Sequence, residues 1–237
     1  NKYGIKIEYS HEKKHWRFKI HGNQSYRFTS ILSEGDWSNA AFLLALGALG
    51  KTPLRIKNLP LPSKQGDIKV LDLLEDFGIT VNCYADIVDN RSGMVDVFPC
   101  RKLTAIPNVD ASESPDLVPI IALIASIANG TTVINNAERL RYKESDRLAS
   151  ICSVLKALGA NITEMEDRLI IVGTEKLQGA YEGDGYGDHR IIMMIAVSSL
   201  VFVDMVKIHG ASAAAKSFPN FFEVLHMLGL DDNIELV

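Results

Sequence analysis

The charged stretch with the most chemical capacity covers residues 141–147, with the sequence RYKESDR, and stands directly before an amphipathic segment. Ser145 is expected to cap the helix that follows, because a serine oxygen accepts a hydrogen bond from the first free N–H groups. Lys143 and Glu144 then lie in the preceding loop, and Arg147 lies on the first turn of the helix. Two cations and a carboxylate at a helix N-terminus suit an anionic ligand. The alternative is an ordinary solvated helix start.

Three further charged motifs stand at other predicted helix starts. Asp188 is expected to cap a helix that opens with His189 and Arg190, so that Arg190 faces the same N-terminal end. Asp116 follows a Ser-Pro pair typical of a helix start, and Lys216 precedes a Ser-Phe-Pro sequence. Each has an ordinary alternative, namely a cap, an acid that complements the helix dipole, or a surface cation. We interpret His189 as structural rather than as a base.

These motifs belong to a repeat. Three segments begin at Asp36, Asp116 and Asp188, at intervals of 80 and 72 residues. Each segment reads as an apolar helix, a β-branched strand, a second helix and closing strand sequence. Equivalent helix N-termini of repeated units converge on one rim of a domain. The rim is expected to hold Lys143, Arg147, Arg190 and Lys216, with Asp116 and Glu144 as the nearby acids. Such a rim suits a ligand that carries both carboxylate and phosphate.

Glycines punctuate the repeat at matching positions. Gly78, Gly159 and Gly229 each follow the second helix of a unit, where a left-handed residue commonly ends a helix. Gly50 and Gly130 similarly follow the apolar first helices. The pattern indicates an α/β (α+β) fold built from repeated units of helix, strand, helix, strand and strand.

The chain is expected to enter this repeat late. Its first residues resemble the ends of the second helices, with Gly4 at the capping position. Residues 1–30 are therefore expected to supply the closing strands of a truncated first domain, and residues 31–237 a three-unit domain. The expected units cover about 31–105, 106–180 and 181–237. The third unit leaves room for at most one closing strand, so we expect a fragment of a longer protein.

Composition narrows the class of protein. The 237 residues are 47% hydrophobic and 23% charged, with a formal net charge of −4, which gives no basic excess for nucleic acid. No apolar run is long enough to suggest a membrane span. The three cysteines, Cys83, Cys100 and Cys152, are far apart and have no metal-ligand spacing. This pattern favours a reduced, cytoplasmic compartment.

Five motifs together resemble the EPSP synthase family, and they cover essentially the whole chain in the family's order. They are EGDWSNAAF (34–42), SPDLVP (114–119), LRYKESDRL (140–148), GDHRIIMMIAV (187–197) and KSFPNFF (216–222). The resemblance implies the enolpyruvyl transferase fold, which is built from repeated βαβαββ units. It also implies transfer of the enolpyruvyl group of phosphoenolpyruvate to the 5-hydroxyl of shikimate 3-phosphate, without a metal or organic cofactor.

The resemblance also assigns roles to residues of the motifs. Asp116 would take the proton of the 5-hydroxyl, and Glu144 would handle the proton at the methylene carbon, since addition needs a base at the nucleophile and an acid at the developing methyl. Asp116 and Lys143 would contact shikimate 3-phosphate. The residues that would bind phosphoenolpyruvate are Arg147, Arg190 and Lys216.

One position departs from the family. Arg139 stands where many members have asparagine or a similar polar residue against the shikimate phosphate.

The residues that the family's front half supplies are not in this chain, so we expect no turnover by the chain alone. Two alternatives remain: part of a UDP-N-acetylglucosamine enolpyruvyl transferase, which shares the fold but lacks the Lys-Glu-Ser-Asp-Arg signature, or a non-catalytic anion-binding module.

Overall fold

A computed structural model describes residues 3–13, 15–27, 30, 33–85, 93–177, 181–201 and 205–237. The chain divides into two compact units, Asn1–Ser33 and Glu34–Val237. Residues 31 and 32, next to the boundary expected after residue 30, lie outside the described residues.

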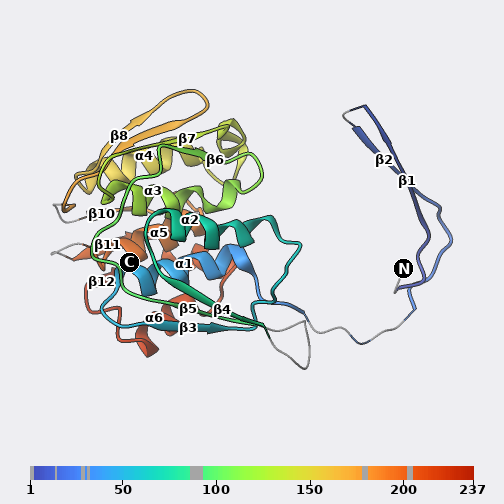
Figure 1. The fold of residues 1–237 in the computed structure, drawn as a ribbon, viewed down its shortest axis with the longest axis horizontal. Coiled ribbons are helices and arrows are strands. Elements are labelled where there is room, and N and C mark those ends of the chain that lie inside the picture. Colours follow the sequence, from blue (N-terminus) through green and yellow to red (C-terminus); the bar gives the residue numbers. More distant parts are fainter. Residues whose placement is uncertain are drawn as a thin grey trace. The chain divides into compact units, whose positions relative to one another are not determined.

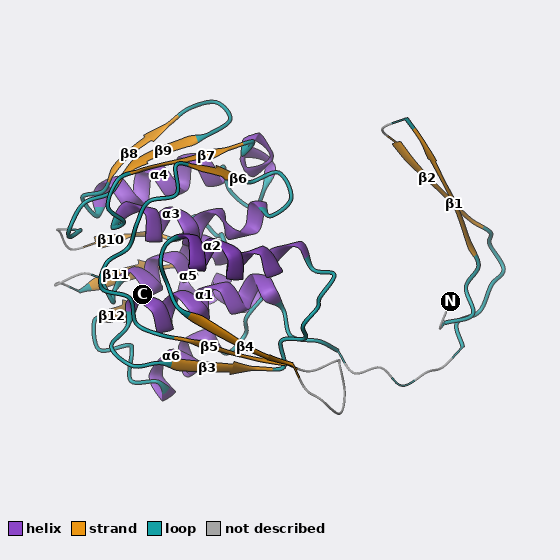
Figure 2. Ribbon diagram, in the orientation of Figure 1, coloured by secondary structure: helices purple, strands orange, loops and turns teal. Residues whose placement is uncertain are grey.

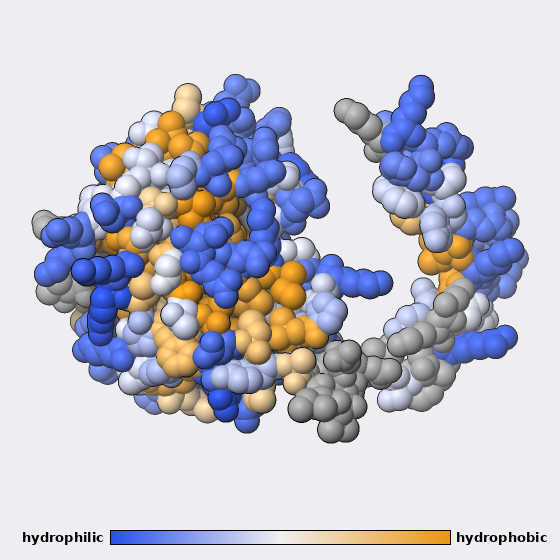
Figure 3. Space-filling view, in the orientation of Figure 1, coloured by the Kyte–Doolittle hydropathy of each residue, from blue (hydrophilic) through white to orange (hydrophobic). Residues whose placement is uncertain are grey.

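The first unit contains an antiparallel hairpin of β1 (Ile7–Glu12) and β2 (His15–Ile20). Ile7 lies opposite Ile20 and Tyr9 opposite Phe18, so that the alternation of side chains places the apolar residues of both strands on one face. That face consists of Ile7, Tyr9, His11, Trp16, Phe18 and Ile20. Its large apolar side chains are exposed, and Figure 3 shows apolar residues gathered on the hairpin.

The second unit contains three modules of the predicted kind (Figure 1). The first module consists of α1 (Trp37–Leu49), β3 (Leu54–Lys57), η1 (Gly66–Lys69), α2 (Val70–Asp76), β4 (Val81–Ala85) and β5 (Gly93–Val97). The second consists of β6 (Asn108–Asp110), η2 (Pro115–Leu117), α3 (Val118–Ser126), β7 (Thr131–Asn135), η3 (Glu138–Tyr142), α4 (Arg147–Ala157), β8 (Asn161–Glu164) and β9 (Leu169–Val172). The third consists of β10 (Tyr181–Asp184), α5 (His189–Ser198), β11 (Val206–His209), η4 (Ala211–Lys216), α6 (Phe221–Met227) and β12 (Ile234–Leu236).

Each module has its own sheet. The strand orders are β3-β5-β4, β6-β7-β9-β8 and β10-β11-β12. The first sheet is antiparallel, the second is mixed, and the third is parallel. Within the described residues only β12 follows α6, whereas two strands close each of the other modules.

The core forms where the first helices of the three modules meet. Helices α1, α3 and α5 contact one another, and every residue of α3 and α5 is buried. A helix that is apolar on nearly all sides must be covered on all sides, which explains this central position. Figure 2 shows the three sheets on the outside of the unit with the helices between them.

The predicted capping glycines are largely confirmed. Gly78, Gly159 and Gly229 have φ values of 87°, 84° and 65°, in the left-handed region that glycine adopts without steric cost. Gly130 is also left-handed, at φ 118°. Gly50 differs, because it ends α1 with an extended backbone (φ −75°, ψ −164°) and donates its N–H to the Leu46 carbonyl.

Among the described residues, no helix has the length and apolar character needed to cross a membrane.

Candidate functional site

The starts of three helical segments from two modules bring the predicted site residues together. Asp116 lies in η2, Lys143 and Glu144 lie in the loop before α4, and Arg147 is the first residue of α4. Arg190, from the first turn of α5, completes the group. Asp116 forms ion pairs with all three cations, so that these residues form one connected cluster.

Arg147 is the buried centre of the cluster. Its side chain is 1% exposed, and it donates from Nη1 to Asp116 Oδ1 (2.6 Å) and from Nη2 to Glu144 Oε2 (2.6 Å). Asp188, which is fully buried, accepts from Nε at 2.7 Å and from Nη2 at 3.2 Å. Carboxylates thus occupy four of the five N–H donors of a guanidinium. The predicted contact of Arg147 with phosphoenolpyruvate therefore requires an exchange of these partners.

Asp188 has two tasks at the start of α5. It accepts a hydrogen bond from the Arg190 backbone N–H, as an N-cap, and it is paired with Arg147. Burial alone raises the pKa of Asp188, but the hydrogen bonds and positive charge of Arg147 outweigh it and hold the pKa below its usual range. The Asp188 carboxylate is therefore ionised at neutral pH.

Asp116 lies among three cations. Oδ1 is 2.6 Å from Arg147 Nη1 and 3.3 Å from Lys143 Nζ, and Oδ2 is 3.3 Å from Arg190 Nη2. Burial raises the pKa of Asp116, but the three positive charges, that of Arg190 foremost, lower it below the usual value. In this arrangement the carboxylate is ionised and is a weak base.

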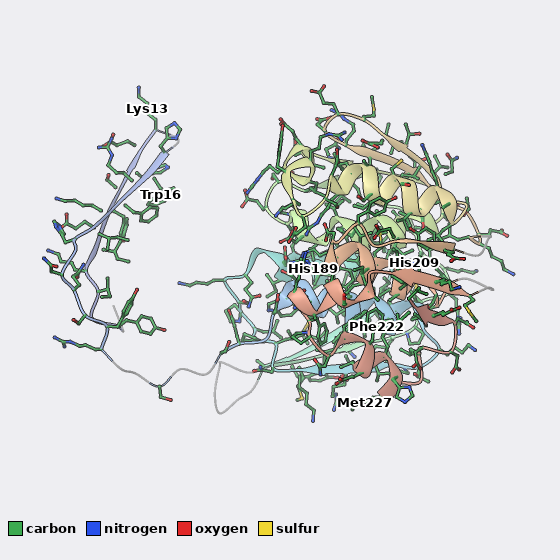
Figure 4. The ribbon with its side chains drawn as sticks, turned by 180° about the vertical axis from the view of Figure 1, so that it is seen from behind. Lys13, Trp16, His189, His209, Phe222 and Met227 are labelled. Atoms are coloured by element: carbon green, nitrogen blue, oxygen red, sulfur yellow. The ribbon has the colours of Figure 1, made fainter. Side chains whose placement is uncertain are left out.

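Glu144 lies between Arg147 and His189. One carboxylate oxygen pairs with Arg147, and the other is 3.6 Å from His189 Nδ1. Burial and then the charge of Arg190 lower the pKa of His189, which keeps the imidazole neutral at neutral pH. Figure 4 labels His189 at the beginning of α5. This surrounding agrees with a structural role for the ring.

The Arg190 guanidinium has N–H donors without a hydrogen-bond partner among the described residues. Its side chain is 9% exposed, and within the described part of the chain its only ion pair is with Asp116. Nε and Nη1 are buried and have no hydrogen-bond partner among the described residues. Burying a donor without a partner costs free energy, so these two N–H groups are well placed to donate hydrogen bonds to an anion that enters the site. The planar fork of a guanidinium matches a carboxylate or a phosphate.

Lys216 lies beside the cluster rather than in it. Nζ donates to the Gly187 carbonyl at 2.8 Å, one residue before Asp188. The adjacent Ser217 exchanges two hydrogen bonds with Asn39 on α1: Asn39 Nδ2 donates to the Ser217 carbonyl at 2.9 Å, and Ser217 Oγ donates to Asn39 Oδ1 at 3.2 Å. The start of α1 therefore holds the segment that carries Lys216.

The structure differs from one prediction, the N-cap of α4, and leaves another, the role of Arg139, as a prediction. The N-cap of α4 is Asp146, which accepts from the Ala149 N–H, whereas Ser145 was expected. The helix begins one residue later than expected, and Ser145 Oγ donates instead to Asp188 at 3.1 Å. Arg139 is exposed in η3, and its contact with a ligand stays a prediction.

Sequence reasoning missed one acid near the cluster. Asp67 is buried in η1 and accepts a hydrogen bond from Ser38 Oγ on α1. Burial raises its pKa, and the negative charge of Asp116 adds to this shift. The available signal was the Gln-Gly-Asp sequence at the start of the first module's second helix, the position at which the second module carries its charged motif.

Comparisons with known proteins agree with the resemblance seen in the motifs. The profile of the family described as EPSP synthase (3-phosphoshikimate 1-carboxyvinyltransferase) matches residues 1–225. The chain is similar to the 3-phosphoshikimate 1-carboxyvinyltransferase of Clostridium acetobutylicum, with 40% identity over 97% of this chain and 50% of the relative. It is also similar to the protein of that name from Methanococcus maripaludis, with 37% identity over 100% of this chain and 53% of the relative.

Solved structures share the fold. An EPSP synthase from Acinetobacter baumannii superposes with a TM-score of 0.75 at 25% identity, over 96% of this chain and 52% of that one. An enolpyruvyl transferase from Streptomyces tendae gives a TM-score of 0.72 at 21% identity, over 96% and 50%, which shows likeness of fold alone. The chain spans about half the length of the relatives that it matches.

Proposed function

Because this chain belongs to the EPSP synthase family, we propose that it forms the C-terminal part of a 3-phosphoshikimate 1-carboxyvinyltransferase. The intact enzyme transfers the enolpyruvyl group of phosphoenolpyruvate to the 5-hydroxyl of shikimate 3-phosphate and releases phosphate. The observation that carries the proposal is the cluster around Asp116. This partly exposed carboxylate pairs with Lys143 and with Arg190, two of whose donors have no partner among the described residues, while Glu144 pairs with the central Arg147.

The reaction needs one proton to leave the nucleophile and one to reach the carbon that becomes a methyl. In the proposed addition, the 5-hydroxyl oxygen bonds to C2 of phosphoenolpyruvate, Asp116 takes the hydroxyl proton, and Glu144 delivers a proton to C3. In the elimination the bond from C2 to the phosphate oxygen breaks, phosphate leaves with the proton that Asp116 took, and the methyl returns its proton to Glu144, so that both carboxyl groups regain their starting states. Both acids are partly exposed, at 27% and 37%, and so are within reach of a ligand.

Ligand binding would also raise the pKa of Asp116, the proposed base. Without ligand, Lys143, Arg147 and Arg190 all hold the pKa of Asp116 down. Lys143 is assigned to shikimate 3-phosphate, while Arg147, Arg190 and Lys216 are assigned to phosphoenolpyruvate. When the ligand anions draw these cations, less positive charge acts on Asp116 and its pKa rises toward the range that favours proton transfer.

The first unit supports the view that the chain is one part of a two-domain enzyme. The hairpin exposes Tyr9 at 70%, Trp16 at 58% and Phe18 at 62% on the same face. A contiguous exposed apolar face marks a contact surface. We assign residues 1–30 to the closing strands of the preceding domain, whose remainder covers this face. The other wall of the site lies in that domain, so that the chain alone has no turnover.

The chemistry and the cysteines together suit a cytoplasmic enzyme. Cys83, Cys100 and Cys152 are all free thiols in the structure. Free thiols that persist without pairing are typical of reducing compartments. No metal or organic cofactor enters the proposed reaction, and the ligands are phosphoenolpyruvate and shikimate 3-phosphate.

A phosphate-release assay tests the proposal. The test protein, called here the extended protein, carries before Asn1 the part of the Clostridium acetobutylicum relative that this chain does not cover. With phosphoenolpyruvate and shikimate 3-phosphate, the extended protein is expected to release phosphate, and the 237-residue chain is expected to release none above background.

Three outcomes would overturn parts of this account. A folded extended protein that uses neither substrate contradicts the proposed reaction. Turnover with UDP-N-acetylglucosamine in place of shikimate 3-phosphate assigns the chain to the sister transferase. Turnover by the 237-residue chain alone contradicts the need for a second domain.

A further inference from the structure

The loop that carries Lys143 and Glu144 is closed at its base by Arg141. The loop consists of residues 142–145, which run from the last residue of η3 to the residue before the N-cap of α4. Arg141 precedes this loop and Asp146 follows it, and Arg141 Nη1 donates to Asp146 Oδ2 at 2.9 Å. The ion pair thus joins the two ends of a four-residue loop.

Arg141 also ties the loop to the neighbouring sheet. Nη1 donates to Glu164 Oε1 at the end of β8 at 2.9 Å. Nε and Nη2 donate to the carbonyls of Glu166 and Met165, at 2.8 and 2.7 Å, in the turn between β8 and β9. The guanidinium therefore makes four hydrogen bonds to two carboxylates and two carbonyls, a set that its rigid fork of donors can satisfy and an ammonium cannot.

Asp146, which accepts from Arg141 at the end of the loop, is also the N-cap of α4. Asp146 caps α4, because its other carboxylate oxygen accepts from the Ala149 N–H at 3.1 Å. The next residue is Arg147, the buried centre of the cluster. Arg141 is thereby linked both to the loop and to the helix start from which Arg147 reaches Asp116.

We infer that Arg141 is a positioning residue, which holds Lys143 and Glu144 at the site by fixing both ends of their loop to β8. The inference rests on the proposed function, since it concerns the two residues assigned there to shikimate 3-phosphate and to proton transfer. Within the described part of the chain, Arg141 itself forms no hydrogen bond or ion pair with Asp116 or Arg190, so it acts through the loop.

Arg168 supplies a matched control on the same turn. It pairs with the adjacent Asp167, at 2.8 and 3.0 Å, and its side chain is 41% exposed. Removing Arg168 therefore deletes an arginine and an ion pair from the turn between β8 and β9 without touching the loop. Any general effect of losing a charge there appears in Arg168→Ala as well.

Hydrogen exchange of the 237-residue chain is the first measurement. Arg141→Lys is expected to speed exchange of the amides of residues 142–146 about tenfold or more, while amides in the middle of α4 keep their rates. Arg168→Ala is expected to leave the loop unchanged. Glu164→Gln, which keeps an acceptor oxygen but loses the charge, is expected to have a smaller effect and serves if Arg141→Lys does not fold.

Kinetics of the extended protein are the second measurement. Arg141→Lys is expected to raise the KM for shikimate 3-phosphate and to lower kcat, each about tenfold to a hundredfold, because small misplacements of reacting groups are costly. Its KM for phosphoenolpyruvate should change less than its KM for shikimate 3-phosphate, since two of the three residues assigned to phosphoenolpyruvate, Arg190 and Lys216, lie outside the segment that Arg141 holds. Arg168→Ala should match the unmodified protein in all three constants.

The inference is overturned if Arg141→Lys leaves the exchange of the loop unchanged, or if its kinetic constants match those of Arg168→Ala. An extended protein that is folded but inactive before any substitution overturns the proposed function instead. In that case the exchange rates of the loop still decide whether Arg141 holds it.

Discussion

The starts of α4 and α5 each present an arginine to the same carboxylate, yet the two arginines are in opposite states. Arg147 is 1% exposed and gives four hydrogen bonds to carboxylates of the protein. Arg190 is nearly as buried, at 9%, but two of its nitrogens have no partner among the described residues. An arginine at the N-terminal end of a helix therefore builds the cluster in one case and is left available to a ligand in the other.

The largest expected effect concerns the stability that Arg147 supplies. Arg147→Met should lower the free energy of unfolding of the chain by about 3–5 kcal/mol, because removing one partner of a buried ion pair leaves Asp188 uncompensated. Denaturant unfolding at pH 7 measures this. Arg147→Met combined with Asp188→Asn should regain part of the loss. A loss under about 1 kcal/mol for the single variant would show that Arg147 does not hold the cluster together.

Arg190→Met should weaken ligand binding strongly while it changes the stability of the chain little. Its free energy of unfolding should change by about 1 kcal/mol or less, since it removes donors that are already unsatisfied. In the extended protein the KM for phosphoenolpyruvate should rise roughly tenfold to a hundredfold, the equivalent of about 1.5–3 kcal/mol for hydrogen bonds to a charged group. Arg190→Lys keeps the charge and should fall between the two. An unchanged KM would remove Arg190 from the ligand site.

Acid should narrow the difference between the unmodified chain and Arg147→Met. The pKa of Asp188 is depressed in the folded protein, so its contribution to stability is present above the unfolded pKa of about 4 and is lost as pH falls through the lower folded pKa. In Arg147→Met the buried carboxyl is instead easier to protonate. Unfolding measured from pH 7 down to about pH 3 should show the two free energies converging below about pH 4. A constant gap would contradict the pairing.

The smallest expected effect is at Asp67, whose pKa is shifted the opposite way. A raised folded pKa contributes stability below the unfolded value of about 4 and loses it as pH rises through the folded pKa. Asp67→Asn, which still accepts from Ser38 Oγ, should therefore stabilise the chain at pH 7 by up to about 1 kcal/mol, with no gain below about pH 4. Destabilisation at pH 7 would show that the carboxylate is held ionised by a partner.

Local features of the sequence were sufficient for the repeat and for the approximate helix starts. Capping acids and left-handed glycines act over a few residues, so Asp188 and Gly159 are found where their neighbours predict them. The cap at α4 shows the limit of such reasoning. Ser145 and Asp146 are both good caps, and the choice depends on Asp188, which lies 43 residues later and accepts the Ser145 hydroxyl.

The sequence did not predict that Arg147 would be satisfied by carboxylates of the protein while Arg190 keeps donors without a partner among the described residues. The family resemblance of the motifs assigned Arg147 to phosphoenolpyruvate, together with Arg190 and Lys216. Whether a guanidinium is satisfied depends on acids that are distant in the sequence, and Asp116 and Asp188 are 31 and 41 residues away from Arg147. The bonds of Arg141 to the turn after β8 were hidden for the same reason.

In the proposed function, the cluster forms one wall of an enolpyruvyl transfer site and Asp116 is the base. The most direct test compares phosphate release by the extended protein and its Asp116→Asn variant, with both substrates saturating and unfolding measured for each. Turnover by the unmodified extended protein and a loss of about a hundredfold or more in kcat for a folded Asp116→Asn variant is the predicted result. A folded Asp116→Asn variant that releases phosphate at the unmodified rate would contradict it.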